Sequence, residues 1–390
     1  MAEFQPSNRT FVGGEGNYLV DARGRRIFDA VSSIWTTVHG HCHPHIVERI
    51  ALQAASLDHA TLLGATNPVA EELAARLAAL TGTSHVFFSS DGASAVEVAL
   101  KIVIQYWQNS GEPQRTRFVH FVDAYHGDTT GAMSVSDIAL FKSRFAPLTF
   151  ESISYGEVSR VLDSPEVAAV IVEPIVQAAA GMRIVPHSSY RRFNDISPLL
   201  IVDEIATGFG RTGTLFAFEQ LGLKPDIICA GKGITGGTLA LSATLASERV
   251  YEAFLGNHAQ HKHLFHGHSY AGNPIACAAA LANLELFESE RTLERSVAAA
   301  QAIQPALEAI RSHRLVRAVR QTGLMIGIEL RGEEIVRRGI SPAWDVADAL
   351  YARGHFTRPI GDTIQLVPPL SSTASELEAF VAALHETLGS

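Results

Sequence analysis

The sequence has few cysteines and no extended basic cluster. Only 3 of its 390 residues are cysteine, and Cys42, Cys229 and Cys277 form neither a CxxC pair nor an even framework. Scattered cysteines are typical of a reducing compartment rather than of a disulfide scaffold. The formal net charge is -9, and basic groups such as "DARGRR" are short. We therefore expect neither nucleic acid nor a membrane surface among the partners.

Long apolar runs are also missing. None approaches the length that spans a bilayer, and the opening "MAEFQPSNRTF" lacks the basic-then-apolar pattern of a signal peptide. The composition, 47% hydrophobic and 18% charged, is that of a globular protein with a large core. These features predict a cytoplasmic protein, and the chain is long enough for two domains.

Short apolar runs alternate with helical patterns over residues 41–288. The runs are "HVFFSS", "RFVHFVDA", "VAAVIVEP", "PLLIVDE", "DIICAG" and "LSATLAS". They are apolar throughout rather than alternating, as in strands buried on both faces of a sheet. The pattern predicts a large α/β domain with a mostly parallel sheet. Residues 289–390 read as a smaller α+β domain, which residues 1–40 are expected to join because chain termini often lie close together.

Two polar residues follow predicted buried strands. "LLIVDE" contains Asp203, and "DIICAG" leads to Lys232, which stands between Gly231 and Gly233. Ligands of open α/β sheets bind at the carboxyl ends of strands. Taken singly, the aspartate could cap a turn and the lysine could reach the surface. A desolvated lysine at such a place is, however, a nucleophile that forms Schiff bases with carbonyl groups.

Two further stretches could hold parts of a ligand. In "SSDGASAVEVALK", the small residues Gly92 and Ala93 open a long helix, and free amides there would bind an anion. The stretch could also be an ordinary turn, and it matches neither a dinucleotide fingerprint nor a Walker loop. In "DAYHGDTTGAM", Tyr125 could stack on a flat ring or simply belong to the core.

The histidine-rich stretch "HGHCHPH" suggests a metal site only weakly. His39, His41, His43 and His45 stand at alternate positions, but no further ligand follows at a recognised spacing. We therefore predict no metal. His126, next to the aromatic residue of "DAYHGD", is given no role as proton carrier or ligand.

The four features together fit one ligand, pyridoxal phosphate. It has a phosphate for the helix start, a ring for Tyr125, a ring nitrogen for Asp203 and a carbonyl for Lys232. An aspartate at the ring nitrogen keeps that nitrogen protonated, so the ring can accept electrons from the substrate. The lysine would hold the aldehyde as an imine and, once released by the substrate amine, carry a proton.

Four stretches resemble the class III (omega) aminotransferases of pyridoxal phosphate fold type I: "IVDEIATGFGRTG", "AGKGITGG", "YHGDTTGAMSV" and "HGHSYAGNPIACAAA". The resemblance extends from about residue 17 to the C-terminus. Within the class, "SSIWTTVHGHCHP", "QYW" and "RPIGDTIQLVPP" resemble the branch that converts 7-keto-8-aminopelargonate into 7,8-diaminopelargonate in biotin synthesis, with lysine or adenosylmethionine as amino donor. An omega-aminotransferase acting on another amino acid, diamine or keto acid is the main alternative.

The resemblance implies a role for each matching residue. Lys232, Asp203 and Tyr125 would be catalytic, and Ser269 would reach the phosphate in a neighbouring subunit, which implies a homodimer with shared sites. Many relatives place a hydroxyl donor where this chain has Ala93, so that contact is expected to be missing. The cofactor site implied by the resemblance consists of Gly92, Ala93, Tyr125, Glu173, Gln177, Asp203, Lys232 and Ser269.

The same resemblance implies a substrate site. Arg358 would bind the substrate carboxylate through a two-pronged guanidinium contact. The substrate site implied by the resemblance consists of Ile34, Trp35, Asp128, Arg211, Arg358 and Gln365. Ile34 replaces a tryptophan and Gln365 a tyrosine of some relatives, and an N-terminal segment of many relatives is expected to be missing. The aliphatic Ile34, together with "HGHSY" and "RPIGD", resembles the enzymes that use lysine as donor. The departures leave another amine or keto acid open.

Two readings from other classes remain at this stage. A racemase or decarboxylase on the same fold would use the same lysine and aspartate, because these two residues alone do not set the reaction type. A non-catalytic relative serving as a scaffold is the other alternative.

Overall fold

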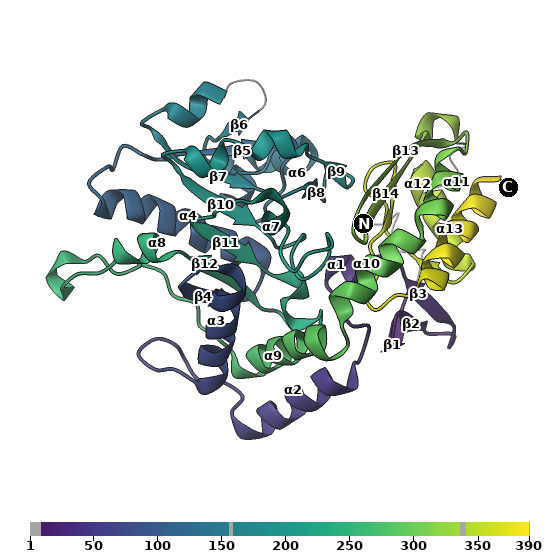
Figure 1. Ribbon diagram of the computed structural model, residues 1–390, viewed down its shortest axis with the longest axis horizontal. Helices are drawn as coiled ribbons and strands as arrows, with labels where there is room; N and C mark the ends of the chain where they lie inside the picture. Colours follow the sequence, from purple (N-terminus) through teal and green to yellow (C-terminus); the bar gives the residue numbers. More distant parts are fainter. Residues whose placement is uncertain (1–8, 156–158, 336–340, 390) are drawn as a thin grey trace.

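The computed structural model describes residues 9–155, 159–335 and 341–389. The expectation for the N-terminal segment lies partly outside these ranges, since residues 1–8 are not among them. Figure 1 shows two bodies side by side, a large one built on a wide sheet and a smaller one that gathers the first strands and the last helices. Among the described residues, no helix has the length and apolar character needed to span a membrane.

The large body contains a seven-stranded sheet with the order β4-β12-β11-β10-β7-β5-β6. Only β12 runs antiparallel to its neighbours, so the prediction of a mostly parallel sheet in an α/β fold is confirmed. The strands are β4 (His85–Ser89), β5 (Arg117–Phe121), β6 (Ile153–Tyr155), β7 (Val167–Val172), β10 (Leu199–Asp203), β11 (Ile227–Ala230) and β12 (Ser242–Ala246).

Both faces of this sheet are buried, which explains why its central strands are apolar at every position. In β10, Leu200 and Val202 belong to one hydrophobic cluster, whereas Leu199 and Ile201 belong to the cluster on the opposite face. Successive side chains of a strand point to opposite faces, so a strand covered on both sides has no polar alternation. The last residue, Asp203, is the first polar one and stands at the carboxyl end.

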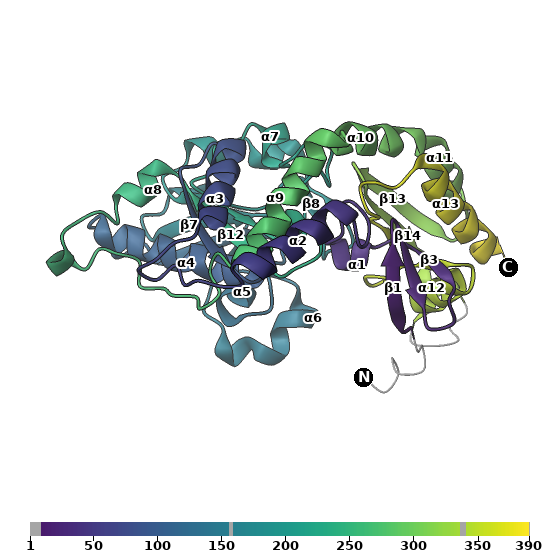
Figure 2. The same ribbon diagram turned by 90° about the horizontal axis from the view of Figure 1, so that it is seen from below.

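Three long helices cover the two faces. α4 (Gly92–Asn109) packs into one cluster, and α3 (Pro68–Thr81) and α9 (Pro274–Ser289) pack into the other. Each begins at a capping side chain: Asn67 and Asn273 precede a proline at the first helical position, and Asp91 precedes α4. α2 (Pro44–Ser56) lies along α9 (Figure 2).

The smaller body joins segments from both ends of the chain. β13 (Val316–Thr322), β14 (Met325–Leu330) and β16 (Thr363–Leu366) form an antiparallel sheet. A second sheet has the order β1-β2-β3-β15 and pairs the N-terminal strands with a C-terminal one. Its strands are β1 (Phe11–Glu15), β2 (Tyr18–Asp21), β3 (Arg26–Asp29) and β15 (His355–Phe356). The helices of this body are α10 (Thr292–Ala302), α11 (Gln304–Arg311), α12 (Pro342–Ala352) and α13 (Ala374–Gly389).

The turn α1 (Ser32–Trp35) is left-handed. All four residues have positive φ, from 46° at Ser32 to 70° at Ile34, and Trp35 N donates to Val31 O across the turn. A left-handed turn costs L-residues roughly 1–2 kcal/mol each, and a β-branched isoleucine is a clear outlier there. Strain of this kind persists only where surrounding contacts impose it, and it clusters at functional sites.

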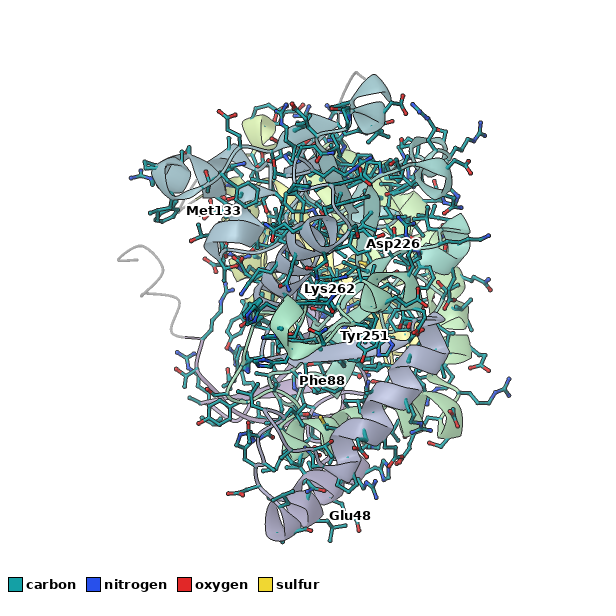
Figure 3. All side chains as sticks on the ribbon, turned by 90° about the vertical axis from the view of Figure 1, so that its left-hand side faces the viewer. Glu48, Phe88, Met133, Asp226, Tyr251 and Lys262 are labelled. Atoms are coloured by element: carbon teal, nitrogen blue, oxygen red, sulfur yellow. The ribbon has the colours of Figure 1, made fainter. Side chains whose placement is uncertain are left out.

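The other elements are short. The chain also forms α5 (Thr130–Ser134), α6 (Ala139–Lys142), α7 (Phe218–Leu221), α8 (Glu248–Glu252), β8 (Val176–Gln177) and β9 (Arg183–Ile184). Its 3-10 turns are η2 (Ser143–Leu148), η3 (Ser159–Asp163), η4 (His187–Tyr190), η5 (Phe193–Asp195), η6 (Lys232–Thr235), η7 (His258–Gln260) and η8 (Gly332–Glu334). Figure 3 shows Glu48 of α2 at the outer edge of the large body and Phe88 of β4 inside it, in keeping with their exposed and buried side chains.

Candidate active site

A cavity of about 440 Å³ opens at the carboxyl edge of the large sheet, next to α1. It is lined by Trp35, Asp91, Gly92, Ala93, Tyr125, His126, Gly127, Asp128, Thr129, Glu173, Asp203, Ile205, Ala206 and Lys232. The fold therefore brings together residues from strand ends, a helix start and the N-terminal turn. Eight of the residues singled out from the sequence line this one cavity: Trp35, Gly92, Ala93, Tyr125, Asp128, Glu173, Asp203 and Lys232.

Lys232 projects from the turn that follows β11. It begins η6 with a φ of 44°, after the extended Gly231, and its Nζ lies 5.0 Å from the centroid of the Trp35 ring. Burial lowers the pKa of Lys232; the nearby carboxylates of Asp203 and Glu173 oppose this shift. The amine is thus more often neutral than an exposed lysine, which is the form that attacks carbonyl groups.

Asp203 and His126 form a buried pair. His126 Nδ1 lies 2.7 Å from Asp203 Oδ2, and Asp203 Oδ1 accepts a hydrogen bond from the Ile205 amide at 3.0 Å. A carboxylate is only an acceptor, so the imidazole proton belongs on Nδ1. His126 Nε2 is buried and has no hydrogen-bond partner within the part of the chain that the structure describes. From the sequence, this histidine was assigned no role. Its position next to Tyr125 is the feature that could have pointed to it.

The start of α4 leaves two amides free. Asp91 Oδ1 accepts from Ser94 N at 2.9 Å and Asp91 O from Ala95 N, whereas no residue of the described chain accepts from the amides of Gly92 and Ala93. A Cβ atom at Gly92 would lie 2.7 Å from Ile205 Cγ2, so only glycine fits there. Free amides and the helix dipole make this end of α4 suitable for an anion such as phosphate.

Hydrogen bonds hold both the backbone amide and the side-chain hydroxyl of Tyr125. Its amide donates to Glu173 Oε2 at 3.1 Å, and its hydroxyl donates to Asp128 Oδ2 at 2.8 Å. Burial, with Asp128 as the second cause, raises the pKa of Tyr125, so its hydroxyl stays protonated. Burial raises the pKa of Glu173 to about 7, although two backbone amides donate to its carboxylate. The ring of Tyr125 therefore forms a fixed wall of the cavity.

Arg211 lies outside the cavity lining, although the resemblance implied a place in the substrate site. Its guanidinium is 1% exposed and donates to Pro368 O at 2.6 Å, to Thr37 O at 2.7 Å and to Ser32 Oγ at 3.2 Å. Burial lowers the pKa of Arg211 to about 10. These contacts connect the loop after β10 with both ends of the left-handed turn and with the C-terminal body.

Five other residues implied by the resemblance also lie outside the lining. Gln177 is buried and donates to Val122 O at 2.8 Å, and Ser269 is exposed, with its carbonyl bonded by His59 Nε2 at 2.9 Å. Gln365 is buried behind Trp35, and Arg358 is exposed. Ile34, the fifth, is 39% exposed beside Trp35. The structure thus separates these side chains from the group around Lys232.

The alternate histidines of "HGHCHPH" point to different partners. Among the described residues, no group of three or more histidine, cysteine, aspartate or glutamate side chains is placed to hold a metal ion. The pairs are His39 with Asn283 O, His41 with Asp29, His43 with Glu290 and His45 with Glu285.

Glu204, next to Asp203, faces away from the cavity. It is fully buried and accepts hydrogen bonds from the Thr207 hydroxyl and the Phe218 amide. Burial raises the pKa of Glu204 from its ordinary 4.5 to about 7. Between these two values the folded chain binds more protons than the unfolded chain, so this residue lowers stability as pH rises.

Replacing Glu204 with glutamine is therefore expected to remove part of the pH dependence of stability. From about pH 5 to about pH 8, the unfolding free energy of the variant should rise relative to wild type by about 1–3 kcal/mol. Urea unfolding at both pH values measures this difference. Glu48→Gln, at an exposed position of α2, is the control. Parallel pH curves for Glu204→Gln and wild type would show that Glu204 is not a buried titrating group.

The cavity fits pyridoxal phosphate by the chemistry of its donors. Two free amides stand at a helix start, a buried carboxylate lies 2.7 Å from a histidine, and a lysine with a lowered pKa faces the same space. An aromatic ring and Ile205 add apolar surface for a flat ring. Phosphate, pyridine nitrogen, ring and aldehyde each find a suitable group here.

The comparisons with known proteins agree with this chemistry. The family model "Aminotransferase class-III" matches residues 4–388. The adenosylmethionine-8-amino-7-oxononanoate aminotransferase of Geobacter sulfurreducens is 39% identical, over 100% of this chain and 94% of its own length. The enzyme of that name from Aquifex aeolicus is 41% identical, over 97% of this chain and 91% of its own length.

Solved structures with the same fold are also aminotransferases. The crystal structure of the adenosylmethionine-8-amino-7-oxononanoate aminotransferase from Methanocaldococcus jannaschii has a TM-score of 0.91 and 39% identity, covering 98% of this chain and 93% of that one. An amine transaminase from an uncultivated Pseudomonas species, solved with bound pyridoxal phosphate, has a TM-score of 0.92 and 32% identity, covering 100% and 96%. The chain therefore belongs to the class III aminotransferases, pyridoxal phosphate-dependent enzymes of fold type I.

Proposed function

We propose that the enzyme transfers an amino group to 8-amino-7-oxononanoate, which is 7-keto-8-aminopelargonate, and so forms 7,8-diaminopelargonate in biotin synthesis. The observation that carries the aminotransferase chemistry is the gathering of Lys232, the Asp203–His126 pair and the free amides of α4 around one cavity. The choice of substrate is supported by relatives of that name that are 38–42% identical to most of the chain.

Each residue of the cavity has a definite task in this proposal. Pyridoxal phosphate, when bound, supplies a ring that withdraws electrons from the substrate Cα. The amides of Gly92 and Ala93 would bind its phosphate, and the Asp203 carboxylate, oriented by His126, would hold a proton on its ring nitrogen. Lys232 Nζ would take the proton from the substrate Cα and deliver it to the cofactor, since its lowered pKa favours a free amine.

Substrate recognition is assigned to Asp128 and Trp35, which line the cavity, and to Arg358, which lies outside the lining. The Asp128 carboxylate accepts from the Tyr125 hydroxyl and keeps further lone pairs for a substrate ammonium group. Trp35 supplies an apolar wall for the carbon chain. The exposed Arg358 side chain makes no hydrogen bond or ion pair with the described part of the chain. Its guanidinium fork is available for the substrate carboxylate.

The proposal includes a homodimer in which Ser269 approaches the phosphate of the partner's site. Ser269 is exposed. Two hydrogen bonds hold its loop: one joins His59 Nε2 to the Ser269 carbonyl, and the other joins His268 Nε2 to Ser90 Oγ at 2.9 Å. The loop thus presents the serine hydroxyl outward from a fixed base. Sedimentation of the cofactor-loaded enzyme, together with cofactor affinity of Ser269→Ala, tests both parts.

The amino donor is lysine or adenosylmethionine. The names of the relatives point to adenosylmethionine, whereas Ile34, together with "HGHSY" and "RPIGD", resembles lysine-using enzymes. A single-turnover experiment decides: the cofactor-loaded enzyme is mixed with each donor, and loss of the visible absorbance of the lysine-bound cofactor is followed. Ornithine, glutamate and alanine serve as comparison donors. The true donor is expected to react at least about tenfold faster than these.

The proposed acceptor is tested by growth. The gene should restore growth without biotin to a strain that lacks 7,8-diaminopelargonate formation, and the Lys232→Ala variant should not. An enzyme that reacts with amino donors but fails to restore growth would instead be an omega-aminotransferase for another acceptor. The likeness to the amine transaminase of the Pseudomonas species, with a TM-score of 0.92, supports that second function.

A further inference from the structure

Gln365 on β16 lies behind Trp35, which lines the cavity, and connects Trp35 with the backbone at Arg358. Its side chain is 1% exposed and has both polar ends occupied. Gln365 Oε1 accepts a hydrogen bond from the Trp35 indole Nε1 at 2.7 Å, and Gln365 Nε2 donates to the backbone carbonyl of Arg358. A glutamine in this state has little capacity left for a substrate, because its oxygen and its amide are already engaged.

The two groups joined by Gln365 lie far apart in sequence. Trp35 ends the left-handed turn α1, lines the cavity and faces Lys232 Nζ. Arg358 follows β15 in the C-terminal body and exposes its guanidinium. Among the described residues, no other side chain bonds both. Backbone bonds also connect the two segments, since Ala30 N donates to Phe356 O and Val367 N donates to Ala30 O, and the Gln365 amide adds the side-chain link to the aromatic wall.

We propose that Gln365 is a positioning residue that holds the backbone of the carboxylate-binding Arg358 against the aromatic wall Trp35, and so favours acceptors that carry a free carboxylate. The inference rests on the proposed function, because it takes Arg358 as the carboxylate-binding group. It replaces the direct substrate contact that the resemblance implied for Gln365. A side chain with two partners in fixed directions can hold such an arrangement, and losing both bonds would weaken the binding of the acceptor carboxylate.

The neighbouring Thr357 provides a matched control. Its hydroxyl donates to the Gln365 carbonyl and is fully buried, so Thr357→Val removes a hydrogen bond to the same residue without touching the bridge. Gln365→Leu removes both bonds of the bridge at similar volume. If Gln365→Leu does not fold, Gln365→Met replaces it, because its flexible side chain fills the same space without an amide.

The experiment compares acceptors that differ only at the carboxylate. Cofactor-loaded wild type, Gln365→Leu and Thr357→Val are assayed with 8-amino-7-oxononanoate and with its methyl ester. Wild type is expected to prefer the acid. In Gln365→Leu, the ratio of kcat/KM for acid over ester should fall about fivefold to tenfold, mainly through a higher KM for the acid. Thr357→Val should lose thermal stability but keep the wild-type ratio.

A double variant tests whether the change in the acid-over-ester ratio depends on Arg358. In the Arg358→Ala background, Gln365→Leu should change the acid-over-ester ratio by less than about twofold. Equal losses for acid and ester, or a full effect without Arg358, would overturn the positioning role. Failure of the proposed function looks different: wild type would then convert amino donors but turn over neither acid nor ester.

Discussion

Lys232→Ala is expected to lower kcat by about 10⁴-fold or more and to abolish the visible absorbance of the lysine-bound cofactor. Among the described residues, this lysine supplies the only amine that lines the cavity, and burial lowers its pKa. Removing it takes away both the covalent attachment and the group that moves the proton at the substrate Cα. Steady-state kinetics and absorbance spectra of the reconstituted variant measure the two losses separately.

Two control variants test whether the effect comes from the amine itself, from its positive charge or from the loss of any lysine. Lys232→Arg keeps a positive charge in the cavity but cannot form an imine, so it should be as inactive as the alanine variant. Lys224→Ala changes an exposed lysine before β11 and should leave kcat within about twofold of wild type. Turnover of Lys232→Ala near the wild-type rate would exclude this lysine as the catalytic group.

Asp203→Asn is expected to lower kcat by about 10²–10³-fold while leaving the fold intact. The amide has the shape of the carboxylate but no negative charge, so it cannot hold a proton on the ring nitrogen of the cofactor. Its single oxygen can still accept from the Ile205 amide, but its NH2 group then faces His126 Nδ1 in place of the second carboxylate oxygen and can only donate. Cofactor affinity, kcat and thermal stability of the variant are measured together to separate charge from packing.

The neighbouring Glu204 gives the control for this second variant. It is also a buried carboxylate at the end of β10, but it bonds Thr207 and the Phe218 amide rather than the cavity. Glu204→Gln should therefore change the pH dependence of stability and leave kcat within about threefold of wild type. If both variants lost activity equally, the effect would belong to the strand end and not to a charge facing the cofactor.

The fold class and the centre of the site were predictable because they depend on local patterns. β7 and β10 are apolar at every position since both faces of the sheet are covered, and this pattern is visible in the sequence. Asp203 and Lys232 could be singled out because parallel strands bring their carboxyl ends to one edge. The assignment to class III aminotransferases, made on four motifs, is confirmed by the family match.

The parts that could not be predicted depend on side-chain directions and on contacts distant in sequence. Nothing in "SSIW" indicates a left-handed turn, because the residues themselves disfavour it and side-chain bonds with Arg211, Val367 and Gln365 help to hold it in place. His126 was passed over since its value lies in meeting Asp203, which is 77 positions away. The short hairpin of β8 and β9 was also missed, because a two-residue strand leaves no periodic pattern.

The hydrogen bonds of α1 also determine when the cavity can be completed during synthesis. Ser32 Oγ bonds the carbonyl of Val367 and the Trp35 indole bonds Gln365, partners 335 and 330 residues later in the chain. Domains fold from the N-terminus as the ribosome delivers them. The strained turn near the start of this chain has none of these partners until nearly all of it has been translated. The seven-stranded sheet, whose last strand ends at Ala246, can form much earlier. Nascent chains thus carry Lys232 and Asp203 on a folded sheet before the aromatic wall is in place.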